Sequence, residues 1–420
     1  MISEASADDD TTAVRRFIPR LPRSAVVILT GDGVSAFGQG MSLPFLLIYL
    51  HQVRDISLAV AGLVLSMVAL VSFIGNPLSG WLVDKLGSRT VLLGSLVCSA
   101  AGMATFAGVT HAALAFVAAA LLGLGNSVAW PAFDSLLAIV VAVRQRSAAF
   151  ALRNATFNTG MALGAVTAGL IVDTGRAVTF TLVYLIDAAT FLAFIPLLLL
   201  IAVPQMNSAE HAHEVGYRAV LKDRLFLSVA GLLALLFTVG YAQYHAAFPG
   251  WATRDGGIAA NAMGACFAAN AAAIVLVQLP MLRALTGRRR TTAISLASIG
   301  WALTWLAALI FGHAGSGWLA VGGFILTMAM FGIAETALSP TLPAIVNDLA
   351  PDHLRGRYNA VATLGCTTGF FVGPAIAGFA LDADAGNTLL VGLTVACLLA
   401  ALWANRLSRR LPETANQITS

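Results

Sequence analysis

The chain has 420 residues, of which 58% are hydrophobic and only 10% are charged, and its mean hydropathy is +0.84. Soluble domains carry about 25% charged residues, so this composition excludes an ordinary soluble protein. The formal net charge of +4 does not indicate a nucleic-acid partner, because the basic residues follow the apolar runs instead of forming a patch. Apolar runs of about 20 residues can cross a membrane, so we predict an all-α membrane protein.

Twelve apolar stretches follow one another along the chain, and each predicts a membrane-spanning helix. They lie near residues 24–50, 57–83, 90–109, 112–141, 147–172, 177–203, 224–250, 257–283, 291–312, 316–347, 355–380 and 386–407. The polar stretch 204–223 divides them into six plus six. We therefore predict two six-helix bundles, at 24–203 and 224–407, joined by a central loop and flanked by tails at 1–23 and 408–420.

The distribution of Lys and Arg predicts the orientation of these helices. With the N-terminus inside, the inner segments hold 21 basic residues and the outer loops hold three, namely Arg54, Arg176 and Arg254. Loops rich in Lys and Arg stay on the cytoplasmic side. We expect a multi-pass protein of the cell (inner) membrane, in contact with lipid, whose two termini are both cytoplasmic.

The two halves of the chain repeat each other. At a shift of 209 residues, Gly123–Pro131 falls on Gly332–Pro340 without a gap. Further matches at the same shift are Gly160 with Gly369, Gly164 with Gly373, Gly169 with Gly378, and Asp173 with Asp382. A parallel repeat predicts two pseudo-symmetric bundles about an axis along the membrane normal, an arrangement that suits alternating access to a site near the midplane.

The joint between the second and third spans, GWLVDKLGSRT, concentrates charge and glycine in a largely apolar chain. Its pattern is Gly80, Asp84, Lys85, Gly87 and Arg89. An acid at a helix C-terminus is disfavoured unless a cation or another helix N-terminus is near. We therefore predict that this joint holds the two bundles together on the inner side; an ordinary positive-inside turn is the alternative.

This pattern resembles the loop 2–3 signature of the major facilitator superfamily, and the twelve spans, central loop and repeat resemble that family over nearly the whole chain. The resemblance implies a secondary transporter. It also implies that Asp84 engages the inner end of the eleventh span and stabilises an outward-open state. In the second half Ala284 stands where the acid is expected, and we interpret the basic cluster Arg288–Arg290 as a positive-inside anchor.

A glycine series in the eleventh span resembles the Gly-Pro motif that drug/proton antiporters carry in their fifth span. It reads Gly365, Gly369, Gly373-Pro374 and Gly378, each glycine four or five residues from the next. Small residues at this spacing let helices approach closely, so we predict helix packing, a gating role, or both.

The fifth span of this chain has Gly160 and Gly164, with Ala165 where the motif's proline is expected. These glycines predict the same close packing or gating. The stretches PDHLRGR, ending at Arg357, and YLIDAATF, starting at Tyr184, resemble sequences of exporter-like members.

Acids inside the spans are costly and therefore indicate function. Asp32 in the first span, which we expect to be unpaired, and Glu335 in the tenth are the candidates for proton coupling. For Asp32 the alternative is a half-exposed acid lining the inner vestibule. Glu335, whose repeat mate is Asn126, is alternatively a cation-binding or a purely structural acid. The sequence leaves open whether coupling occurs, because Ala119 stands where many proton antiporters carry an arginine.

Asp134 and Arg153 lie equally far from the centre of the loop between the fourth and fifth spans. On an antiparallel helix pair this places them at the same depth, so we predict an intramembrane ion pair that is either structural or a switch. Asp187 in the sixth span is interpreted as structural.

Polar and aromatic residues in the spans that line such a bundle pair are the candidates for substrate binding, because ligand pockets combine apolar walls with a few polar groups. They are Gln39, Asn126, Trp130, Phe157, Asn158, Tyr241, Gln243, Tyr244 and His245.

These observations predict a secondary active transporter that moves a small amphipathic organic compound by alternating access, most simply by proton-coupled efflux of a drug or natural product. The alternatives are an importer or uniporter of a small polar solute, such as a sugar, organic acid or peptide, and a non-transporting membrane receptor. We expect no enzyme, since the spans lack metal, nucleophile-elbow and phosphate-loop motifs. We expect a monomer that uses an ion gradient and no cofactor or metal.

Overall fold

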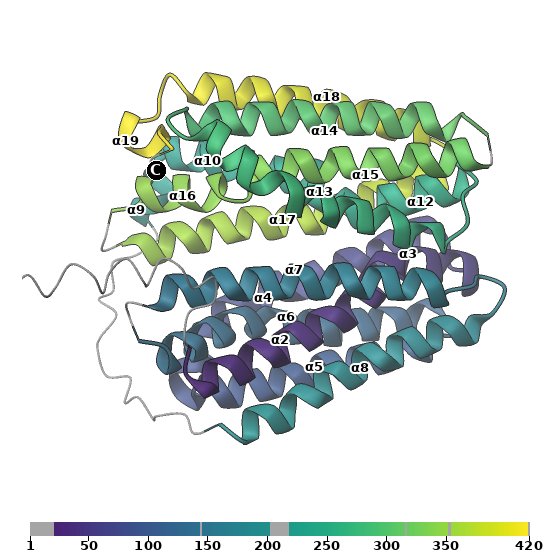
Figure 1. Ribbon diagram of the computed structural model, residues 1–420, viewed down its shortest axis with the longest axis horizontal. Coiled ribbons are helices and arrows are strands. Elements are labelled where there is room, and N and C mark those ends of the chain that lie inside the picture. The colour runs from purple at the N-terminus through teal and green to yellow at the C-terminus, as the bar shows by residue number, and fades with distance from the viewer. Residues whose placement is uncertain (1–20, 143–144, 202–217, 316, 352–353, 419–420) are drawn as a thin grey trace, which may run out of the picture.

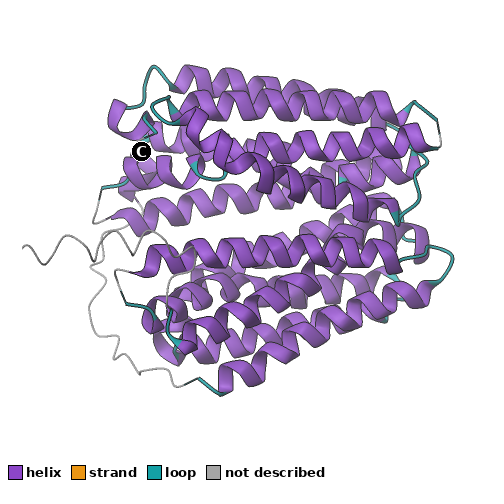
Figure 2. Ribbon diagram, in the orientation of Figure 1, coloured by secondary structure: helices purple, strands orange, loops and turns teal. Residues whose placement is uncertain are grey.

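The computed structural model describes residues 21–142, 145–201, 218–315, 317–351 and 354–418. Within these residues all regular structure is helical, apart from one isolated β-bridge (Figure 2). The helices form two bundles that lie side by side with their long axes nearly parallel (Figure 1). The predicted N-terminal tail lies almost entirely outside the described residues, as does most of the central loop.

The first bundle contains six long helices, whose apolar faces pack on one another. They are α2 (Arg23–Ser42), α4 (Leu58–Leu86), α5 (Ser88–Ala107), α6 (Ala112–Val140), α7 (Arg146–Ile171) and α8 (Ala177–Leu199). The first span continues past α2 through a 3-10 turn (Leu43–Phe45), α3 (Leu46–Ile48) and a π-helical turn (Tyr49–Val53). Pro44 lies at the start of the 3-10 turn, where a residue without a backbone N–H is tolerated.

The second bundle repeats this arrangement with more interruptions. Its span helices are α10 (Arg224–Leu236), α11 (Ala242–His245), α12 (Ala247–Arg254), α13 (Ala262–Leu285), α14 (Arg290–Gly312), α15 (Trp318–Leu338), α16 (Thr341–Leu349), α17 (Arg355–Asp382) and α18 (Gly386–Leu407). A π-helical turn, Phe237–Tyr241, joins α10 to α11, and the short helices α9 (Arg218–Lys222) and α19 (Glu413–Asn416) flank the bundle.

Two predicted spans of the second bundle are not single helices. The span predicted at 224–250 is broken at Ala246, whose φ of −120° and ψ of −72° lie outside the helical region. The span predicted at 316–347 is divided between α15 and α16 at Ser339 and Pro340. Proline cannot donate the backbone hydrogen bond that would continue the helix.

Eleven helical segments of the described chain are long and apolar enough to cross a membrane. The twelfth, α7, has the required length, since its 26 residues extend about 39 Å, but it is more polar. Arg153 and Asn158 are among its polar residues, and α7 packs along α2 inside the first bundle. The chain is therefore an all-α membrane protein with the twelve-helix, two-bundle architecture that the sequence predicts.

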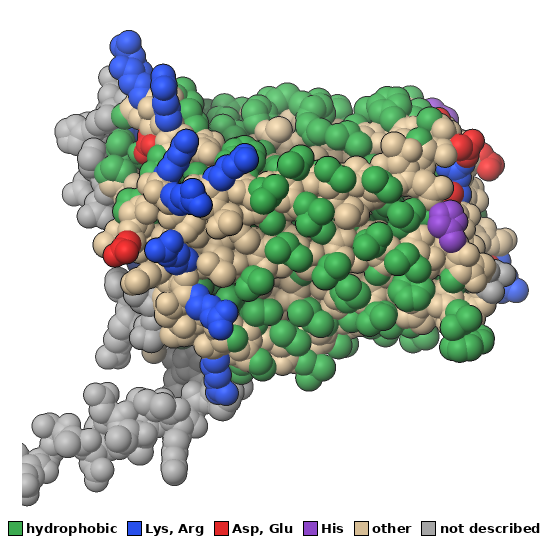
Figure 3. All heavy atoms as spheres, turned by 90° about the horizontal axis from the view of Figure 1, so that it is seen from above, with side chains coloured by type: hydrophobic (Ala, Val, Ile, Leu, Met, Phe, Trp, Pro, Cys, Tyr) green, Lys and Arg blue, Asp and Glu red, His purple; other side chains and the backbone are tan. Residues whose placement is uncertain are grey.

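The two ends of the molecule differ. One end, here called the terminus face, carries the start of α2, the end of α18, α9 and α19 (Figure 1). Lys and Arg side chains gather at this end on the side shown in Figure 3, while hydrophobic side chains cover the body. The opposite end, here called the distal face, carries α3 and α12.

The bundles meet at two glycine contacts near the distal face. A Cβ at Gly378 of α17 would lie 2.5 Å from the Leu58 carbonyl oxygen of α4, and one at Gly169 of α7 would lie 2.6 Å from the Cα of Gly264 in α13. Asp382 strengthens the first contact by accepting a hydrogen bond from the backbone N–H of Leu58 at 3.1 Å. Gly169 and Gly378 are repeat mates. The same kind of glycine contact therefore closes the distal face in two places, between α17 and α4 and between α7 and α13.

We expect Gly378→Ala to weaken this distal seam. Its Cβ would meet backbone atoms, which cannot move aside as a side chain can, and such overpacking costs about 1–3 kcal/mol. Spin labels at His111 and Ala314, in distal loops of the two bundles, should report a longer mean distance by pulsed electron resonance. Gly392→Ala is the matched control, because nothing lies within 4 Å of its added Cβ. Identical distance distributions for both variants would show that the seam does not hold the distal face closed.

The end of the chain is folded onto the second bundle at the terminus face. Arg290 is only 7% exposed, and its guanidinium donates to Asp348 and, at 2.9 Å, to the Ala415 carbonyl oxygen. The Asn416 side chain accepts a hydrogen bond from the Thr291 backbone N–H. Arg290 thus joins the predicted tail to α14 and α16, and the interpretation of Arg288–Arg290 as a positive-inside anchor stays a prediction.

Candidate functional site

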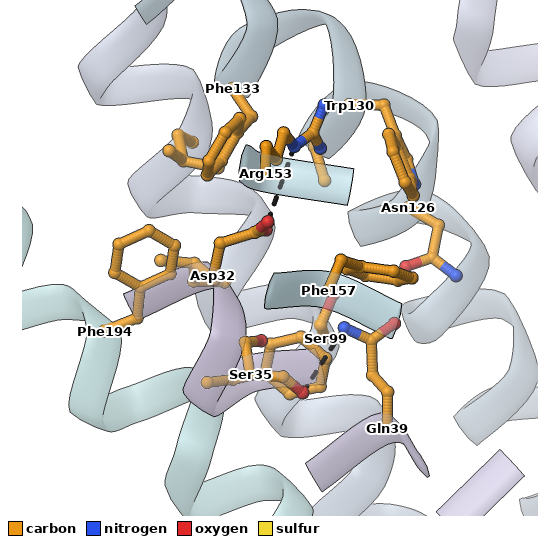
Figure 4. Close-up of a pocket in the computed structure, with 14 residues that line it drawn as sticks. Asp32, Ser35, Gln39, Ser99, Asn126, Trp130, Phe133, Arg153, Phe157 and Phe194 are labelled. Carbon is orange, nitrogen blue, oxygen red and sulfur yellow. Dashed lines mark hydrogen bonds and ion pairs between the residues drawn. The ribbon is translucent and has the colours of Figure 1, made fainter. Parts of the chain in front are cut away.

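Three charged side chains meet inside the first bundle. Arg153 of α7 donates from Nε to Asp32 Oδ2 of α2 at 3.4 Å (Figure 4). The Nη1 of Arg153 donates to Asp134 of α6. The contact between Asp134 and Arg153 that the loop geometry predicts is therefore present. The expectation that Asp32 is unpaired is wrong, because α2 packs directly against α7 and brings the two side chains together.

The three groups differ in exposure. The Arg153 side chain is 6% exposed and that of Asp32 is 13% exposed, whereas that of Asp134 is 49% exposed. The Arg153 guanidinium also lies over two aromatic rings of α6, at 4.3 Å from the Trp130 ring centre and 4.0 Å from that of Phe133. Ring faces attract cations most strongly where water is excluded. Arg153 thus links a buried acid to an acid that reaches the surface.

A small cavity of about 40 Å³ lies beside this cluster. Its polar lining comes from Asp32, Ser35, Gln39, Ser99, Asn126 and Arg153, and its aromatic lining from Trp130, Phe133, Phe157, Phe191 and Phe194. The volume suffices for water but not for a drug-sized compound. Of the predicted substrate residues in this bundle, Gln39, Asn126, Trp130 and Phe157 line the cavity together. Asn158 does not, and it is exposed on α7.

The second bundle holds its own acid in an aromatic cluster. The Glu335 carboxyl of α15 lies beside the side chains of Asn270 of α13 and Tyr241 of the π-helical turn. The Tyr241 ring lies 5.2 Å from that of Trp301, and Trp301 stacks on Phe331 at 4.9 Å. Single π-helical turns within helices occur often at functional sites. Glu335 is thus an acid beside a buried cluster of aromatic rings.

The other predicted substrate residues of this bundle have different surroundings. Tyr244 packs edge-on against Phe267 at 4.8 Å, and His245, its neighbour, has a buried Nδ1 without a partner in the described chain. Gln243 is fully buried, and its amide donates to the carbonyl oxygens of Thr238 and Gly373 at 2.9 and 3.0 Å. The amide nitrogen of Gln243 therefore joins α11 to α17, its Oε1 has no partner among the described residues, and substrate contact by Gln243 stays a prediction.

The glycines predicted to pack helices do so in matching places of the two bundles. A Cβ at Gly160 or Gly164 of α7 would lie 2.5 or 2.0 Å from backbone carbonyl oxygens of α2. A Cβ at Gly369 or Gly373 of α17 would lie within 3.0 Å of the segment 237–242. The carbonyl oxygen of Pro374 faces Gly62 of α4, 2.3 Å from where a Cβ would lie. The close approach of α2 to α7 is what places Asp32 beside Arg153.

The joint between α4 and α5 does not bridge the bundles in this conformation. Asp84 is exposed and has no ion pair with the described residues of α17, so the contact implied for it is not formed. Lys85 lies 4.7 Å from the ring centre of Trp81, and Arg89 donates to the Leu199 carbonyl oxygen within the first bundle. Gly87 turns the chain with a φ of +80°.

Gly80 lies in α4, and its surroundings are outside what the structure describes. Among the residues that the sequence analysis did not single out, Ser35 and Asn270 belong to the two acid clusters. Ser35 follows Asp32 by three residues, so it was visible as a neighbour on one helix face. Nothing in the sequence points to Asn270, because its place depends on how α13 packs against α15.

Two pseudo-symmetric six-helix bundles, each holding an acid among its spanning helices, define a membrane transporter. The family model of the Major Facilitator Superfamily matches residues 28–251 and 244–420, and the chain belongs to this family. As a member of it, the protein is a transporter and not an enzyme.

Similar proteins include an antiporter and a quinolone resistance protein. A Na(+), Li(+), K(+)/H(+) antiporter of Planococcus maritimus is 25% identical over 390 residues, which cover 84% of this chain and 88% of that protein. The quinolone resistance protein NorA of Staphylococcus aureus (strain MRSA252) is 23% identical over 380 residues, 87% of this chain and 92% of that protein.

Solved structures share the fold at lower identity. The nucleoside transporter NupG superposes with a TM-score of 0.73 at 13% identity, covering 92% of this chain and all of that one. An auto-inhibited peptide transporter of the POT family superposes with a TM-score of 0.73 at 16% identity, covering 93% and 98%. The chain therefore resembles drug/proton antiporter members of the family in sequence and transporters of several substrates in fold.

Proposed function

We propose that this protein is a proton-coupled antiporter that exports a small amphipathic organic compound. The observation that carries the proposal is the sharing of Arg153 between Asp32 and Asp134. Two acids and one base carry a net charge of −1 when all three are ionised, and a single proton makes the cluster neutral. A proton bound at Asp32 would neutralise that carboxylate, and Arg153 would then pair with Asp134 alone. Proton binding would therefore weaken the link from α7 to α2 and keep the link from α7 to α6.

Alternating access gives this cluster its role. If both termini are cytoplasmic, as the distribution of Lys and Arg favours, the closed distal face is the outer side, and this conformation is inward-open. In this conformation the two bundles are separated at the inner side, so Asp84 makes no ion pair with the described residues of α17. In this state a compound from the cytoplasm could reach the bundles from inside, while Asp32 gives up its proton.

The surroundings of the second acid, Glu335, suit binding of the exported compound. Glu335 lies near Tyr241 and Tyr244, whose rings pack on Trp301 and Phe331. Aromatic rings beside a carboxyl favour an amphipathic cation. We assign the proton to Asp32 and the charge of the compound to Glu335. Two similar relatives are described as an antiporter with H(+) and as a quinolone resistance protein, which supports proton exchange and export without identifying this compound.

The test is proton movement in inverted vesicles that carry an imposed pH gradient. Ethidium, tetraphenylphosphonium, a fluoroquinolone, a neutral macrolide, a sugar, a dipeptide, Na⁺ and K⁺ would be added separately. Collapse of the gradient by an organic cation, absent from vesicles without the protein, is the expected result. A response to Na⁺ or K⁺ alone would replace the organic compound by an alkali cation. Counterflow of any compound without proton movement would point to a uniporter and reject the proposal.

A further inference from the structure

A groove lies on the outer surface of the second bundle, between α14 and α18. Its volume is about 470 Å³, which is within the range of about 300–1,000 Å³ that is typical of ligand pockets. Each helix lines the groove with one face, since the lining residues recur at intervals of three and four residues. They are Thr292, Ser295, Leu296 and Ile299 of α14, and Leu398, Ala401, Leu402 and Asn405 of α18.

The polarity of the groove changes along its length. α14 begins and α18 ends at the terminus face, so Thr292 and Asn405 form the shallow end of the groove. Ile299 and Leu398 lie seven residues further along their helices, or about 10 Å deeper. The groove is thus polar near the terminus face and apolar toward the middle of the spans, as a membrane lipid is from its headgroup to its acyl chains.

The deeper part of the groove is not covered by the protein. Leu296 and Ile299 are 49% and 41% exposed, and Leu398 and Leu402 are 43% and 54% exposed. In a spanning helix such side chains face lipid, and lipid tails are as apolar as leucine. An acyl chain can therefore lie in this part of the groove, but chain packing alone does not select one lipid over another. The selection depends on the shallow end.

Arginine side chains surround the shallow end. Arg289, directly before α14, donates from Nη1 to the Ser408 Oγ at 3.1 Å, just after α18, so its guanidinium reaches from one helix end to the other. Arg406 follows Leu402 by four residues and lies on the same face of α18. Figure 3, which looks onto the side that α14 and α18 form in Figure 1, shows Lys and Arg side chains gathered at this end. The exposed arginines of the two helix ends are Arg288, Arg289, Arg406, Arg409 and Arg410.

The charge of these arginines is not balanced within the described chain. None of the five takes part in an ion pair there, whereas their neighbour Arg290 is paired with Asp348. Glu413 of α19 is the other acid close to them in sequence. The start of α14 is already capped, since Asn416 accepts a hydrogen bond from the Thr291 N–H. The arginine side chains, and not the helix N-terminus, are therefore the groups that can bind an anion here.

This charge also argues against a second copy of the chain as the occupant. In a two-fold dimer the same surface of each subunit meets its own copy. Pairing through the groove would place the arginines of one subunit against those of the other, and like charges repel. A phospholipid with net negative charge fits both parts of the groove, with its phosphate among the arginines and an acyl chain in the apolar part.

We propose that this groove is a binding site for an anionic phospholipid, with the phosphate at Arg289 and Arg406 and one acyl chain along Leu296, Ile299 and Leu398. Basic pockets between spanning helices at the cytoplasmic side of a membrane bind anionic headgroups by the same attraction. No residue of the groove belongs to the Asp32 or Glu335 clusters. The site is thus separate from the proposed transport of an organic compound.

Native mass spectrometry of the purified full-length protein measures this binding directly. Phosphatidylglycerol and phosphatidylcholine with identical acyl chains would be titrated separately, and the Kd of the first bound lipid compared. We expect phosphatidylglycerol to bind more tightly. Arg289→Gln and Arg406→Gln should each weaken its binding about fivefold, the effect of one basic residue beside an anionic headgroup. Arg283→Gln is the matched control, because Arg283 is exposed at the end of α13 and outside the groove.

The role of the groove is tested by Thr292→Trp, which leaves every arginine in place. Thr292 is exposed, so the larger side chain should not disturb the fold, but its indole would fill the shallow end of the groove. We expect the affinity for phosphatidylglycerol to fall about tenfold, as for overpacking of an occupied site. Leu399→Trp is the control, since Leu399 is 55% exposed on α18 and does not line the groove.

Three results would overturn the site. Equal affinities of the wild type for the two lipids, or equal losses in Arg283→Gln and Arg406→Gln, would show that no headgroup is recognised at these arginines. Unchanged binding in Thr292→Trp would place the lipid outside the groove. A dimer that persists without lipid and dissociates in Thr292→Trp would assign the groove to a second copy of the chain.

Discussion

Arg153→Ala should abolish transport and lower the free energy of unfolding by about 3 kcal/mol. The substitution leaves Asp32 buried without its cation and removes the group that stacks on Trp130 and Phe133. Arg153→Lys should keep part of the stability but little of the transport, because an ammonium cannot present the planar fork that reaches two carboxylates at once. Thermal unfolding in detergent and ethidium efflux from cells measure the two effects.

The matched control is Arg146→Ala, at the start of the same helix. Arg146 is exposed and donates to the Ala138 carbonyl oxygen, so its loss should change stability by no more than about 0.5 kcal/mol. If Arg153→Lys transported as well as wild type, the shared contact with two acids would not be what transport requires. If Arg153→Ala were as stable as Arg146→Ala, the cluster would not be a buried ion pair.

Glu335→Gln should raise the KM for an organic cation roughly tenfold to a hundredfold, as expected for the loss of a charged partner worth about 1.5–3 kcal/mol. Gln retains the size of the side chain beside Asn270 and Tyr241, so the fold of the aromatic cluster should persist. Efflux of ethidium should therefore weaken, while efflux of a neutral compound of similar size should not.

The comparison of charged and neutral compounds separates two roles of Glu335. Equal losses for both would assign Glu335 to the proton instead of the compound. Tyr241→Phe serves as the control, since it removes the phenol oxygen that contacts Glu335 but keeps the ring beside Trp301. It should preserve most of the discrimination between ethidium and the neutral compound.

The membrane made the fold predictable from the sequence. Spanning helices need about 20 apolar residues, so the apolar runs placed nearly all helices, and the repeat indicated two bundles. Helix breaks at Ala246 and Pro340 were missed because both lie within apolar runs, where hydropathy alone cannot show that a helix is divided. The contact of Asp134 with Arg153 was predictable because both residues lie in the helical hairpin of α6 and α7, equally far from its loop.

The remaining parts of the site depend on packing between helices far apart in sequence. Asp32 meets Arg153 only because Gly160 and Gly164 let α7 approach α2, and the sequence did not say which helices would be neighbours. Gln243 was predicted to contact substrate because its amide is polar, and that amide donates a hydrogen bond to the Gly373 carbonyl oxygen of α17. The resemblance implies the Asp84 contact for a conformation with the terminus face closed, whereas this structure has its distal face closed.

The most direct test of proton coupling at Asp32 is the number of protons released when ethidium binds to the purified protein in weakly buffered detergent solution. The account predicts close to one proton released per ethidium bound by wild type, and none by Asp32→Asn, which should still bind. Asp134→Asn is the control that retains Asp32 and should release a proton. Ethidium binding without proton release in wild type, or equal release from Asp32→Asn, would contradict the account.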